Sequence, residues 1–306
     1  MNEAAALIAA TLAAGTPLLL AAIGIVISEK SGVVNLGIEG IMAVAAVAGF
    51  AAAHASGNAE LGFVAGAAAG AALGLLFALL ALGLLANQYA TGLALTLFGA
   101  GLSAFVGQSL QGENLAARGT DGIPWLRELP GIGPALFAQH WMVYVALLLV
   151  VAVAWFLHGT RAGLVLRAVG ESPEAAHALG YPVRAIRVAA LAFGGACAGL
   201  AGAYLSVIYT PLWAEGMVAG RGWIALALVT FATWRPGRVL LGAYLFGGVT
   251  MLQFFLQASG VQIATQLLAM TPYVATIVVL ALISRNPRWI RLNMPASLGK
   301  PFNPNA

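Results

Sequence analysis

Long apolar runs, separated by short polar segments, dominate the sequence from end to end. A helix needs about 20 apolar residues to cross the roughly 30 Å hydrocarbon core of a bilayer. The runs predict crossings at residues 4–27, 33–53, 61–86, 89–108, 141–157, 188–208, 222–234, 239–258 and 261–284. Residues 222–234 are too few to cross unless their helix is tilted, borrows flanking residues or is half of a broken helix. The pattern predicts an all-α polytopic membrane protein with about nine crossings.

Polar residues and prolines interrupt these runs at informative places. Residues 61–112 are too long for a single crossing, and the pair Asn87-Gln88 is the natural break. The second crossing is expected to begin irregularly, because the segment before it is polar and punctuated by glycine. Pro272 predicts a kink in the last crossing.

Glycines recur every four residues in two of the predicted crossings. They are Gly66, Gly70, Gly74, Gly195 and Gly199. Small residues at this spacing let helix backbones approach closely in lipid. The spacing therefore predicts tight helix packing, and it says nothing about cargo.

The composition excludes whole classes of protein. Of the 306 residues, 61% are hydrophobic and 8% are charged, and the mean hydropathy is +0.93. A globular domain carries about 25% charged residues, so a soluble enzyme, a nucleic-acid-binding protein and a disordered chain are excluded. The net charge of +4 comes from basic residues too scattered to form a phosphate-binding face. The single cysteine, Cys197, excludes an intramolecular disulfide.

The basic residues predict the orientation of the chain, because lysine and arginine collect in cytoplasmic loops. They gather in residues 158–187, in the turn 234–238 and in the tail 285–306. Counting crossings from these segments places the N-terminus outside and the C-terminus inside. We expect one transmembrane domain, residues 1–284, with an external loop at 109–139, and a cytoplasmic tail after it.

Motifs for catalysis are missing from the sequence. No G-x-x-x-x-G-K-[ST] motif occurs, and the one Gly-Lys pair, Gly299-Lys300, is followed by Pro301. No H-E-x-x-H motif occurs, and the four histidines are far apart. We therefore expect no catalytic residue, no metal site and no cofactor bound by this chain.

Glu39 is the one carboxylate embedded in an apolar stretch. An ionisable residue inside a membrane is a functional candidate. The alternative, which the neighbouring glycines favour, is a carboxylate near the cytoplasmic interface that bonds to the backbone of its own irregular turn. Under that alternative, Glu39→Gln should harm assembly more than transport.

Residues 167–181 predict a short, well-capped helix. Ser172 is a good N-cap, Pro173 fits the first helical position, and Glu174 complements the helix dipole. Gly180 is a natural C-terminal stop. A helix of about two turns does not hold in water on its own, so it docks either into a partner or onto the protein's own loops.

At this segment the chain resembles a known family. The segments RAVGESPEAAHALGY (167–181), SGVVNLGIEG (31–40) and GRGWIALALVTFATWRPGRVLLGAYLFGG (220–248) resemble ABC importer permeases of the branched-chain amino acid, ribose and nucleoside class. The nucleoside, simple-sugar-like branch matches best. Three separated motifs in the right order make the resemblance specific, and it covers nearly the whole chain. The resemblance implies that the chain lacks the first helix of ribose-type permeases, in agreement with nine crossings.

The resemblance implies a coupling helix that sits in a groove of a separate cytoplasmic ATPase. That ATPase would bind ATP and Mg, so the permease itself would not be an enzyme. The implied coupling residues are Gly170, Glu171, Ser172, Pro173, Glu174, Ala175, Ala176, Ala178, Leu179 and Gly180. A bulky or charged change at Ala176 or Leu179 should then uncouple the protein from the ATPase.

The remaining partners and the pathway also follow from the resemblance. We expect a second related permease, forming a heterodimer, a substrate-binding lipoprotein facing the external loop, contact with membrane lipids, and no nucleic acid. The location implied is the bacterial inner membrane. Cargo would cross between the two permeases. Candidate pathway residues are Asn35, Glu39, Thr91, Thr96, Tyr204, Gln253 and Gln257, although each could equally bond one helix to another.

Two other functions compete with the importer. A self-sufficient ion-coupled secondary transporter suits broken, glycine-rich helices, but only Glu39 could couple an ion. An intramembrane enzyme lacks any paired acid and base or metal constellation. For the importer, nucleoside is the expected cargo, followed by simple sugars and then branched-chain amino acids.

Overall fold

The computed structural model describes residues 3–115, 122–123, 125–128, 133–258 and 293–303. It also describes residues 267, 270, 274, 277 and 278 of the ninth predicted crossing. The rest of that crossing, including the predicted kink at Pro272, lies outside the described residues. The described chain is helical apart from turns, irregular segments and one isolated bridge between Asn114 and Leu212.

Seven of the described helices are long and apolar enough to cross a membrane. Five of them are α1 (Glu3–Lys30), α2 (Ile38–Ser56), α4 (Gln88–Gly107), α6 (Trp141–Gly159) and α11 (Pro236–Ala258). The other two are α3 (Ala59–Ala78) and α9 (Val183–Tyr204), which end in the π-helical turns η1 (Leu79–Gly83) and η4 (Leu205–Tyr209). They correspond to seven of the nine predicted crossings. The count of nine and the orientation stay predictions.

The short run at residues 222–234 forms α10 (Arg221–Phe231), which has 11 residues. At 1.5 Å per residue this helix is about 16 Å long, roughly half the thickness of the hydrocarbon core. Of the possibilities that the sequence left open for this run, the structure favours half of a broken helix. The segment before it, from Thr210 to Gly220, contains no regular helix.

The break at Asn87-Gln88 is confirmed. The Asn87 side-chain oxygen accepts hydrogen bonds from the backbone N–H groups of Tyr89 and Ala90, both at 3.0 Å, and so caps α4. The predicted external loop, 109–139, contains the one-turn helices η2 (Gln108–Leu110), η3 (Leu126–Glu128) and α5 (Gly133–Leu136).

The predicted loop at 158–187 is largely helical, which corrects its description as a loop. It contains α7 (Arg161–Glu171) and α8 (Pro173–Ala178), and α9 already begins at Val183. Thr160 caps α7 by accepting a hydrogen bond from the Gly163 N–H at 3.0 Å. The capping residues in the sequence predicted α8, whereas α7 was not predicted.

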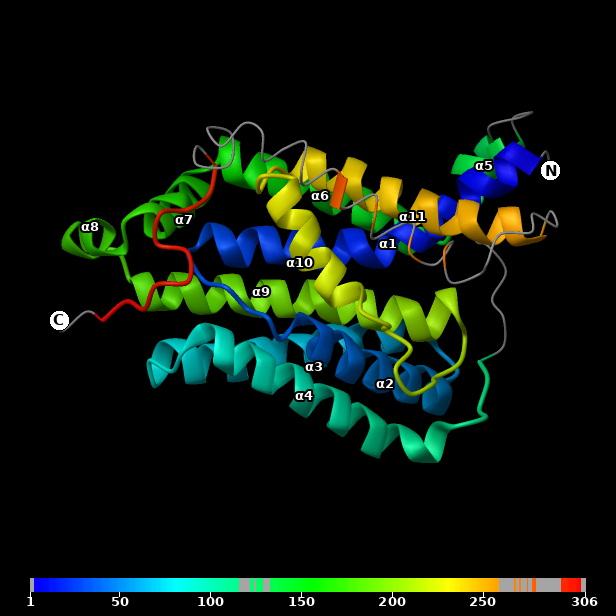
Figure 1. Ribbon diagram of the computed structural model, residues 1–306, viewed down its shortest axis with the longest axis horizontal. Helices are drawn as coiled ribbons and strands as arrows, with labels where there is room; N and C mark the ends of the chain where they lie inside the picture. Colours follow the sequence, from blue (N-terminus) through cyan, green and yellow to red (C-terminus); the bar gives the residue numbers. More distant parts are fainter. Residues whose placement is uncertain are drawn as a thin grey trace.

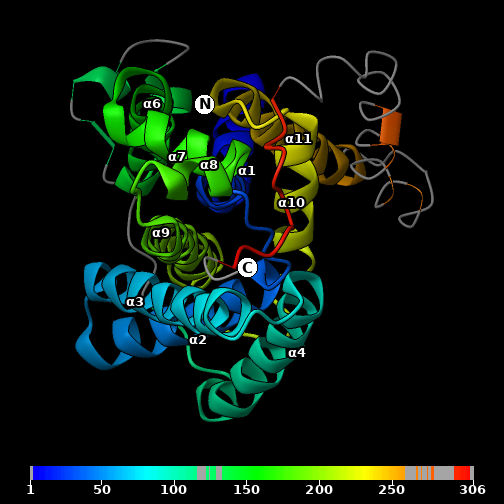
Figure 2. The same cartoon turned by 90° about the vertical axis from the view of Figure 1, so that its left-hand side faces the viewer.

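The transmembrane helices form two groups that meet at α9. In one group, α1 packs against α6, α9, α10 and α11, and it is buried throughout its second half. In the other, α2 packs against α3, α4 and α9. Figure 2 looks along the bundle and shows α1 enclosed by its neighbours, with α4 and α11 on opposite sides.

The close helix packing predicted from the glycines is confirmed between α3 and α9. A Cβ atom added to Gly74 would lie 2.6 Å from the Leu191 carbonyl oxygen, and one on Gly66 would lie 2.6 Å from the Ala203 Cβ. Gly70 and Gly195 face each other so closely that a Cβ on either would overlap the other's carbonyl oxygen. The two backbones therefore touch along their length, as small residues in lipid permit.

The two ends of the bundle differ in charge. At one end, which we call the basic end, the end of α1, the segment α7–α8, the α10–α11 turn and residues 293–303 meet. Among its contacts, the Lys30 Nζ atom donates to the Asn293 carbonyl, and the Arg187 guanidinium donates to the Ser31 carbonyl. At the opposite end, the His54 Nε2 atom lies 3.8 Å from the Glu113 carboxylate. The chain termini also lie at opposite ends (Figure 1).

An irregular segment, residues 31–37, leads from the basic end into the bundle beside α4 (Figure 1). The Val34 N–H donates to the Gln88 side chain at 2.9 Å, where α4 begins. One turn further along, Gly92 packs against the Leu36 backbone. As predicted, the second crossing begins irregularly, and α2 starts well inside the bundle.

Candidate functional site

The short helix α8 is capped by residues that adjoin it in the sequence. The Ser172 hydroxyl oxygen accepts a hydrogen bond from the Ala175 N–H at 3.3 Å, and Pro173 occupies the first turn. At the other end, Gly180 has a φ of 86°, and the Tyr181 N–H donates to the Ala176 carbonyl at 3.1 Å. The predicted caps are therefore present, and the helix spans Pro173–Ala178.

The outer face of α8 is open to solvent and projects beyond the rest of the bundle (Figure 1). Leu179, which directly follows the helix, is 78% exposed. The exposed members of the predicted coupling set are Glu171, Glu174, Ala175, Ala178, Leu179 and Gly180. Leu179 is thus the apolar side chain that the exposed surface of this segment presents.

The remaining members of that set face inward. Gly170, Pro173 and Ala176 are buried, and Ser172 is partly buried. Ala176 belongs to a small apolar cluster with Val169, Val183 and Phe302. Because Ala176 is only 3% exposed, a bulky residue there would disturb the fold of the permease itself. The expectation that a change at Ala176 or Leu179 uncouples the protein from the ATPase stays a prediction, and Leu179 is the one of the two that is exposed.

Residues 293–303, which we call the tail segment, hold α8 and α9 in place. The Phe302 ring packs edge-on against the His177 ring of α8, with centroids 5.6 Å apart. The Ser297 hydroxyl donates to the Gly170 carbonyl at 2.6 Å, and the Ser297 N–H donates to the same oxygen at 3.1 Å. The sequence reasoning described the tail only as a cytoplasmic extension and did not predict these contacts.

Arg187 joins the tail segment to the end of α1. It is fully buried, and its Nε and Nη2 atoms donate to the Ser31 carbonyl at 3.0 Å and to the Ser297 hydroxyl at 3.1 Å. Its guanidinium also lies 5.9 Å from the centre of the Phe302 ring. Arg187 was predicted to lie in the basic loop 158–187, which is wrong, because it lies on α9. The missed signal is helical spacing, because Val183, Arg187 and Ala190 repeat on one buried face.

Deeper in the bundle, Glu39 caps α10 from another helix. Its two carboxylate oxygens accept hydrogen bonds from the N–H groups of Gly220 and Gly222, both at 2.7 Å. Carboxylates favour helix N-termini because of the free N–H groups and the helix dipole. Glu39 does bond to backbone, but the predicted partner, its own turn, is wrong. The partner segment is about 180 positions away in the sequence.

The position of Glu39 along the bundle follows from its neighbour Gly40. Gly40 packs against the backbone of Thr96 and Gly99, in the middle of α4. These residues follow the start of α4 at Gln88 by about 12–17 Å along the helix. The Glu39 carboxylate therefore lies beside the middle of α4, and its expected position near the cytoplasmic interface stays a prediction.

The structure brings four of the predicted pathway residues together around the start of α2. The Asn35 side chain accepts a hydrogen bond from the Gly37 N–H at 2.8 Å, and the Thr96 hydroxyl donates to the Leu36 carbonyl at 2.9 Å. Thr91 lies on the same stretch of α4, and Glu39 lies just beyond it. Each observed bond is made to protein backbone. A cavity of about 160 Å³ beside Glu39 is also lined by Ser103 and Glu215.

The other three predicted pathway residues lie elsewhere. Tyr204 is buried at the end of α9. Gln253 and Gln257 lie partly buried on α11, on the opposite side of the bundle from α4 (Figure 2). Glu215 and Ser103, at the cavity beside Glu39, were missed because they sit in segments that carry no motif.

Nearly the whole chain is similar to known proteins. Residues 7–283 match the family described as the branched-chain amino acid transport system permease component. A putative glucose ABC transporter permease protein of Haloferax volcanii is 41% identical over 99% of both chains. A nucleoside ABC transporter permease protein of Lactococcus lactis is 35% identical over 92% of this chain and 93% of the relative. A guanosine ABC transporter permease protein of Bacillus subtilis is 30% identical over 90% of each.

No solved structure matches the chain. The family match agrees with the fold, because seven described helices are long and apolar enough to cross a membrane. The resemblance seen in the three sequence motifs is thereby confirmed. The chain is a multi-pass plasma-membrane protein that belongs to the family of branched-chain amino acid transport system permease components, the permease subunits of ABC transporters.

Proposed function

We propose that this chain is the permease subunit of an importer that moves a nucleoside or a similar small polar solute, driven by a separate ATPase. ATP is hydrolysed by that partner, and the permease supplies the transport pathway and the helix on which the partner docks. A second related permease and an extracytoplasmic substrate-binding lipoprotein complete the assembly. The basic end faces the cytoplasm in this arrangement, in keeping with the positive-inside rule.

The projecting α8 is the observation that carries this proposal. It is capped at both ends, anchored on its inner face by Phe302, and it presents Leu179 at 78% exposure. The anchored face fixes the position of the helix, and the open face leaves it free to dock. A rigid, exposed helix is suited to pass a partner's movement to the bundle.

The cargo class rests on the names of the relatives and on the polar groups around α2. The relatives are named for nucleoside, guanosine and glucose, and these solutes share a hydroxylated sugar ring. Asn35 and Thr96 supply an amide and a hydroxyl group beside the start of α2, each with one backbone hydrogen bond. Such groups can exchange a backbone partner for a sugar hydroxyl as the pathway opens.

Leu179→Asp tests the docking of α8, with Leu136→Asp as its control. Leu136 is 38% exposed on α5, near the opposite end of the bundle. We expect Leu179→Asp to lower both ATPase copurification and import about tenfold or more, as for a central interface residue, at normal abundance. Leu136→Asp should keep ATPase copurification, which is the readout compared, because residue 136 lies in the external loop expected to face the lipoprotein and not the ATPase. Wild-type copurification and import in Leu179→Asp would show that α8 does not dock there.

Cargo is tested in proteoliposomes that hold the assembled complex and ATP, with labelled guanosine and labelled glucose supplied in parallel. Import of guanosine in excess of glucose supports the nucleoside assignment, and the reverse result identifies a sugar importer.

An ion-coupled secondary transporter is the second candidate, because Glu39 is a carboxylate beside the middle of α4. Both of its oxygens already accept backbone hydrogen bonds, which argues against a role in carrying a proton or cation. Uptake by the permease alone, driven by an ion gradient without ATP, would establish that alternative.

A further inference from the structure

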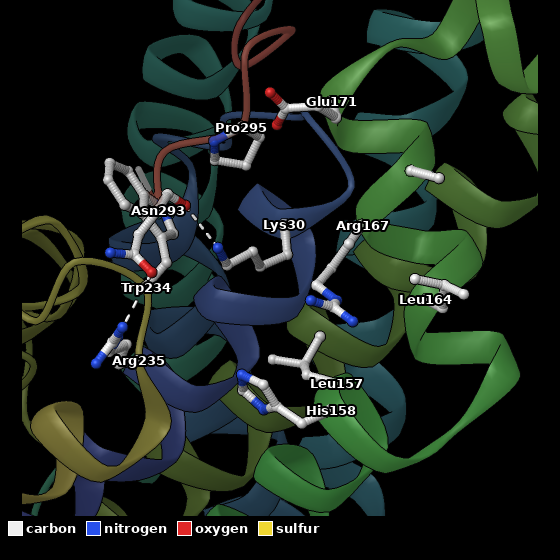
Figure 3. A pocket seen from close by; sticks show the side chains of 11 residues that line it. Lys30, Leu157, His158, Leu164, Arg167, Glu171, Trp234, Arg235, Asn293 and Pro295 are labelled. Atoms are coloured by element: carbon white, nitrogen blue, oxygen red, sulfur yellow. Dashed lines mark hydrogen bonds between the residues drawn. The ribbon is translucent and has the colours of Figure 1, made fainter. Parts of the chain in front are cut away.

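A polar pocket of about 310 Å³ opens at the basic end, away from the Glu39 junction. Figure 3 shows the side chains that line it. They come from four parts of the chain: the last residue of α1, helix α7 with the end of α6, the α10–α11 turn, and the tail segment. The polar members are Lys30, His158, Arg167, Glu171, Arg235 and Asn293.

Three of these side chains are cations that converge from separate segments. Lys30, Arg167 and Arg235 form no ion pair within 4.0 Å among the described residues. Lys30 donates to the Asn293 carbonyl, and the Arg235 Nε atom donates to the Asn293 side chain at 3.4 Å. The positive charges of Arg167 and Arg235 are close enough to Lys30 to repel it, and Glu171 offsets only part of that repulsion.

Arg167 lines this pocket and leaves one of its donors unused. Its Nε atom is buried and has no hydrogen-bond partner among the described residues. Buried N–H donors are almost always paired, so this donor gains a partner if the Arg167 side chain turns toward an acceptor held in the pocket. In Figure 3 the Arg167 guanidinium lies between the Lys30 and Leu157 side chains.

We propose that this pocket binds a phosphate group, supplied by an anionic lipid headgroup or by a soluble phosphate. Two arginine forks and one lysine ammonium suit the several acceptor oxygens of a phosphate. Basic pockets between transmembrane helices on the cytoplasmic side are known to take anionic headgroups. Leu164, 58% exposed on the pocket wall, gives apolar surface beside the charges. The phosphate sits toward Arg167 and Arg235, away from the Glu171 carboxylate.

Binding would tie α7 to the end of α1 and to the α10–α11 turn. Arg167, Lys30 and Arg235 on these elements repel one another, and a phosphate between them replaces repulsion by attraction. Because α7 leads into α8 through a single residue, Ser172, the bound anion also steadies the base of α8.

The test uses the full-length permease purified with its ATPase and placed in nanodiscs. One series contains phosphatidylcholine alone, a second contains phosphatidylcholine with phosphatidylglycerol, and a third contains phosphatidylcholine with inorganic phosphate in the buffer. Native mass spectrometry counts retained phosphatidylglycerol, and thermal unfolding reports stabilisation by either anion. The variant is Arg167→Gln/Arg235→Gln, and the control, Arg161→Gln/Arg184→Gln, removes the same charge from exposed positions outside the pocket.

We expect the wild type and the control to bind one of the two anions at least about tenfold more tightly than the pocket variant, since each charged hydrogen bond contributes about a factor of ten. Preference for phosphatidylglycerol identifies a headgroup as the source, and preference for inorganic phosphate identifies a soluble one. Equal unfolding temperatures in phosphatidylcholine alone show that the pocket variant is folded. If neither anion distinguishes the wild type from the pocket variant, the proposal is overturned.

Discussion

The two short helices α8 and α10 differ in how they are held. Helix α8 has six residues and takes its N-cap from Ser172, directly before it. Helix α10 has 11 residues and takes its cap from Glu39 on α2, about 180 positions away. Most of α8 is exposed, whereas α10 buries residues along most of its length.

This difference separates two mechanical roles. Because α8 carries its own caps, a partner can push on it without unmaking its hydrogen bonds. The start of α10 is bonded to α2, so a movement of either helix must move the other or break two hydrogen bonds. The local caps therefore suit α8 to a contact at the surface, whereas the Glu39 cap ties α10 to α2.

Removing Glu39, the cap that α2 supplies to α10, should have the largest effect on stability and import. Glu39→Ala leaves the Gly220 and Gly222 N–H groups without acceptors, and two hydrogen bonds to a charged group are worth about 3–5 kcal/mol. We expect that loss in the free energy of unfolding, measured by denaturant titration of the purified permease, together with little import. Glu39→Gln keeps one acceptor oxygen and should lose about half as much. An unchanged unfolding transition in Glu39→Ala would show that the cap does not hold α10.

Adding a methyl group at Gly222, where α10 meets α2, should reduce stability somewhat less. A Cβ atom at Gly222 would lie 2.6 Å from the backbone N and Cα atoms of Glu39, and backbone cannot swing away as a side chain can. We expect Gly222→Ala to destabilise by about 2–3 kcal/mol, as overpacking does, and to lower import, measured in the reconstituted complex. If Gly222→Ala imports normally, α2 and α10 can separate without loss of function.

Gly180→Ala is the matched change at the end of α8. No atom lies within 4 Å of a Cβ there, and only the positive φ of 86° opposes the substitution. The left-handed conformation costs an alanine about 1–2 kcal/mol. We expect that modest loss in the same titration, with the ATPase still bound. A loss as large as that of Gly222→Ala would remove the contrast between the two helices.

Removing the local cap of α8 should have the smallest effect. Ser172→Ala loses one hydrogen bond to the Ala175 N–H, and the loss of an N-cap costs about 1 kcal/mol. Hydrogen exchange at Ala175 should accelerate about fivefold while the transmembrane helices stay protected. Acceleration that spreads to α9 would show that α8 is not independent of the bundle.

Local chemistry explains how much of the fold could be predicted. The crossings follow from the length of apolar runs, the α3–α4 break from Asn87, and α8 from Ser172, Pro173 and Gly180. The α3–α9 contact follows from glycines that repeat every four residues. Each of these signals acts over one or two helical turns, so a single sequence displays it directly. The family resemblance then placed the motifs in a transport system.

Contacts between distant segments account for what could not be predicted. The partner of Glu39 lies on a segment whose position depends on the packing of several helices. The hydrogen bonds of Arg187 could not be predicted because its acceptors, Ser31 and Ser297, come from the two ends of the chain. The tail segment contains no helical pattern. The contacts of its Ser297 with Gly170 and of its Phe302 with His177 arise only once the bundle has formed.

Cross-linking from position 179 tests the central claim, that α8 is the docking element for a separate ATPase. The one native cysteine, Cys197, is buried, so a benzophenone maleimide will label an introduced Leu179→Cys. Ser56→Cys, exposed at the end of α2, is the control at the opposite end of the bundle. The account predicts that illumination links position 179 to the ATPase and leaves position 56 unlinked to it. An ATPase adduct at position 56, or none at position 179 in an actively transporting complex, would contradict it.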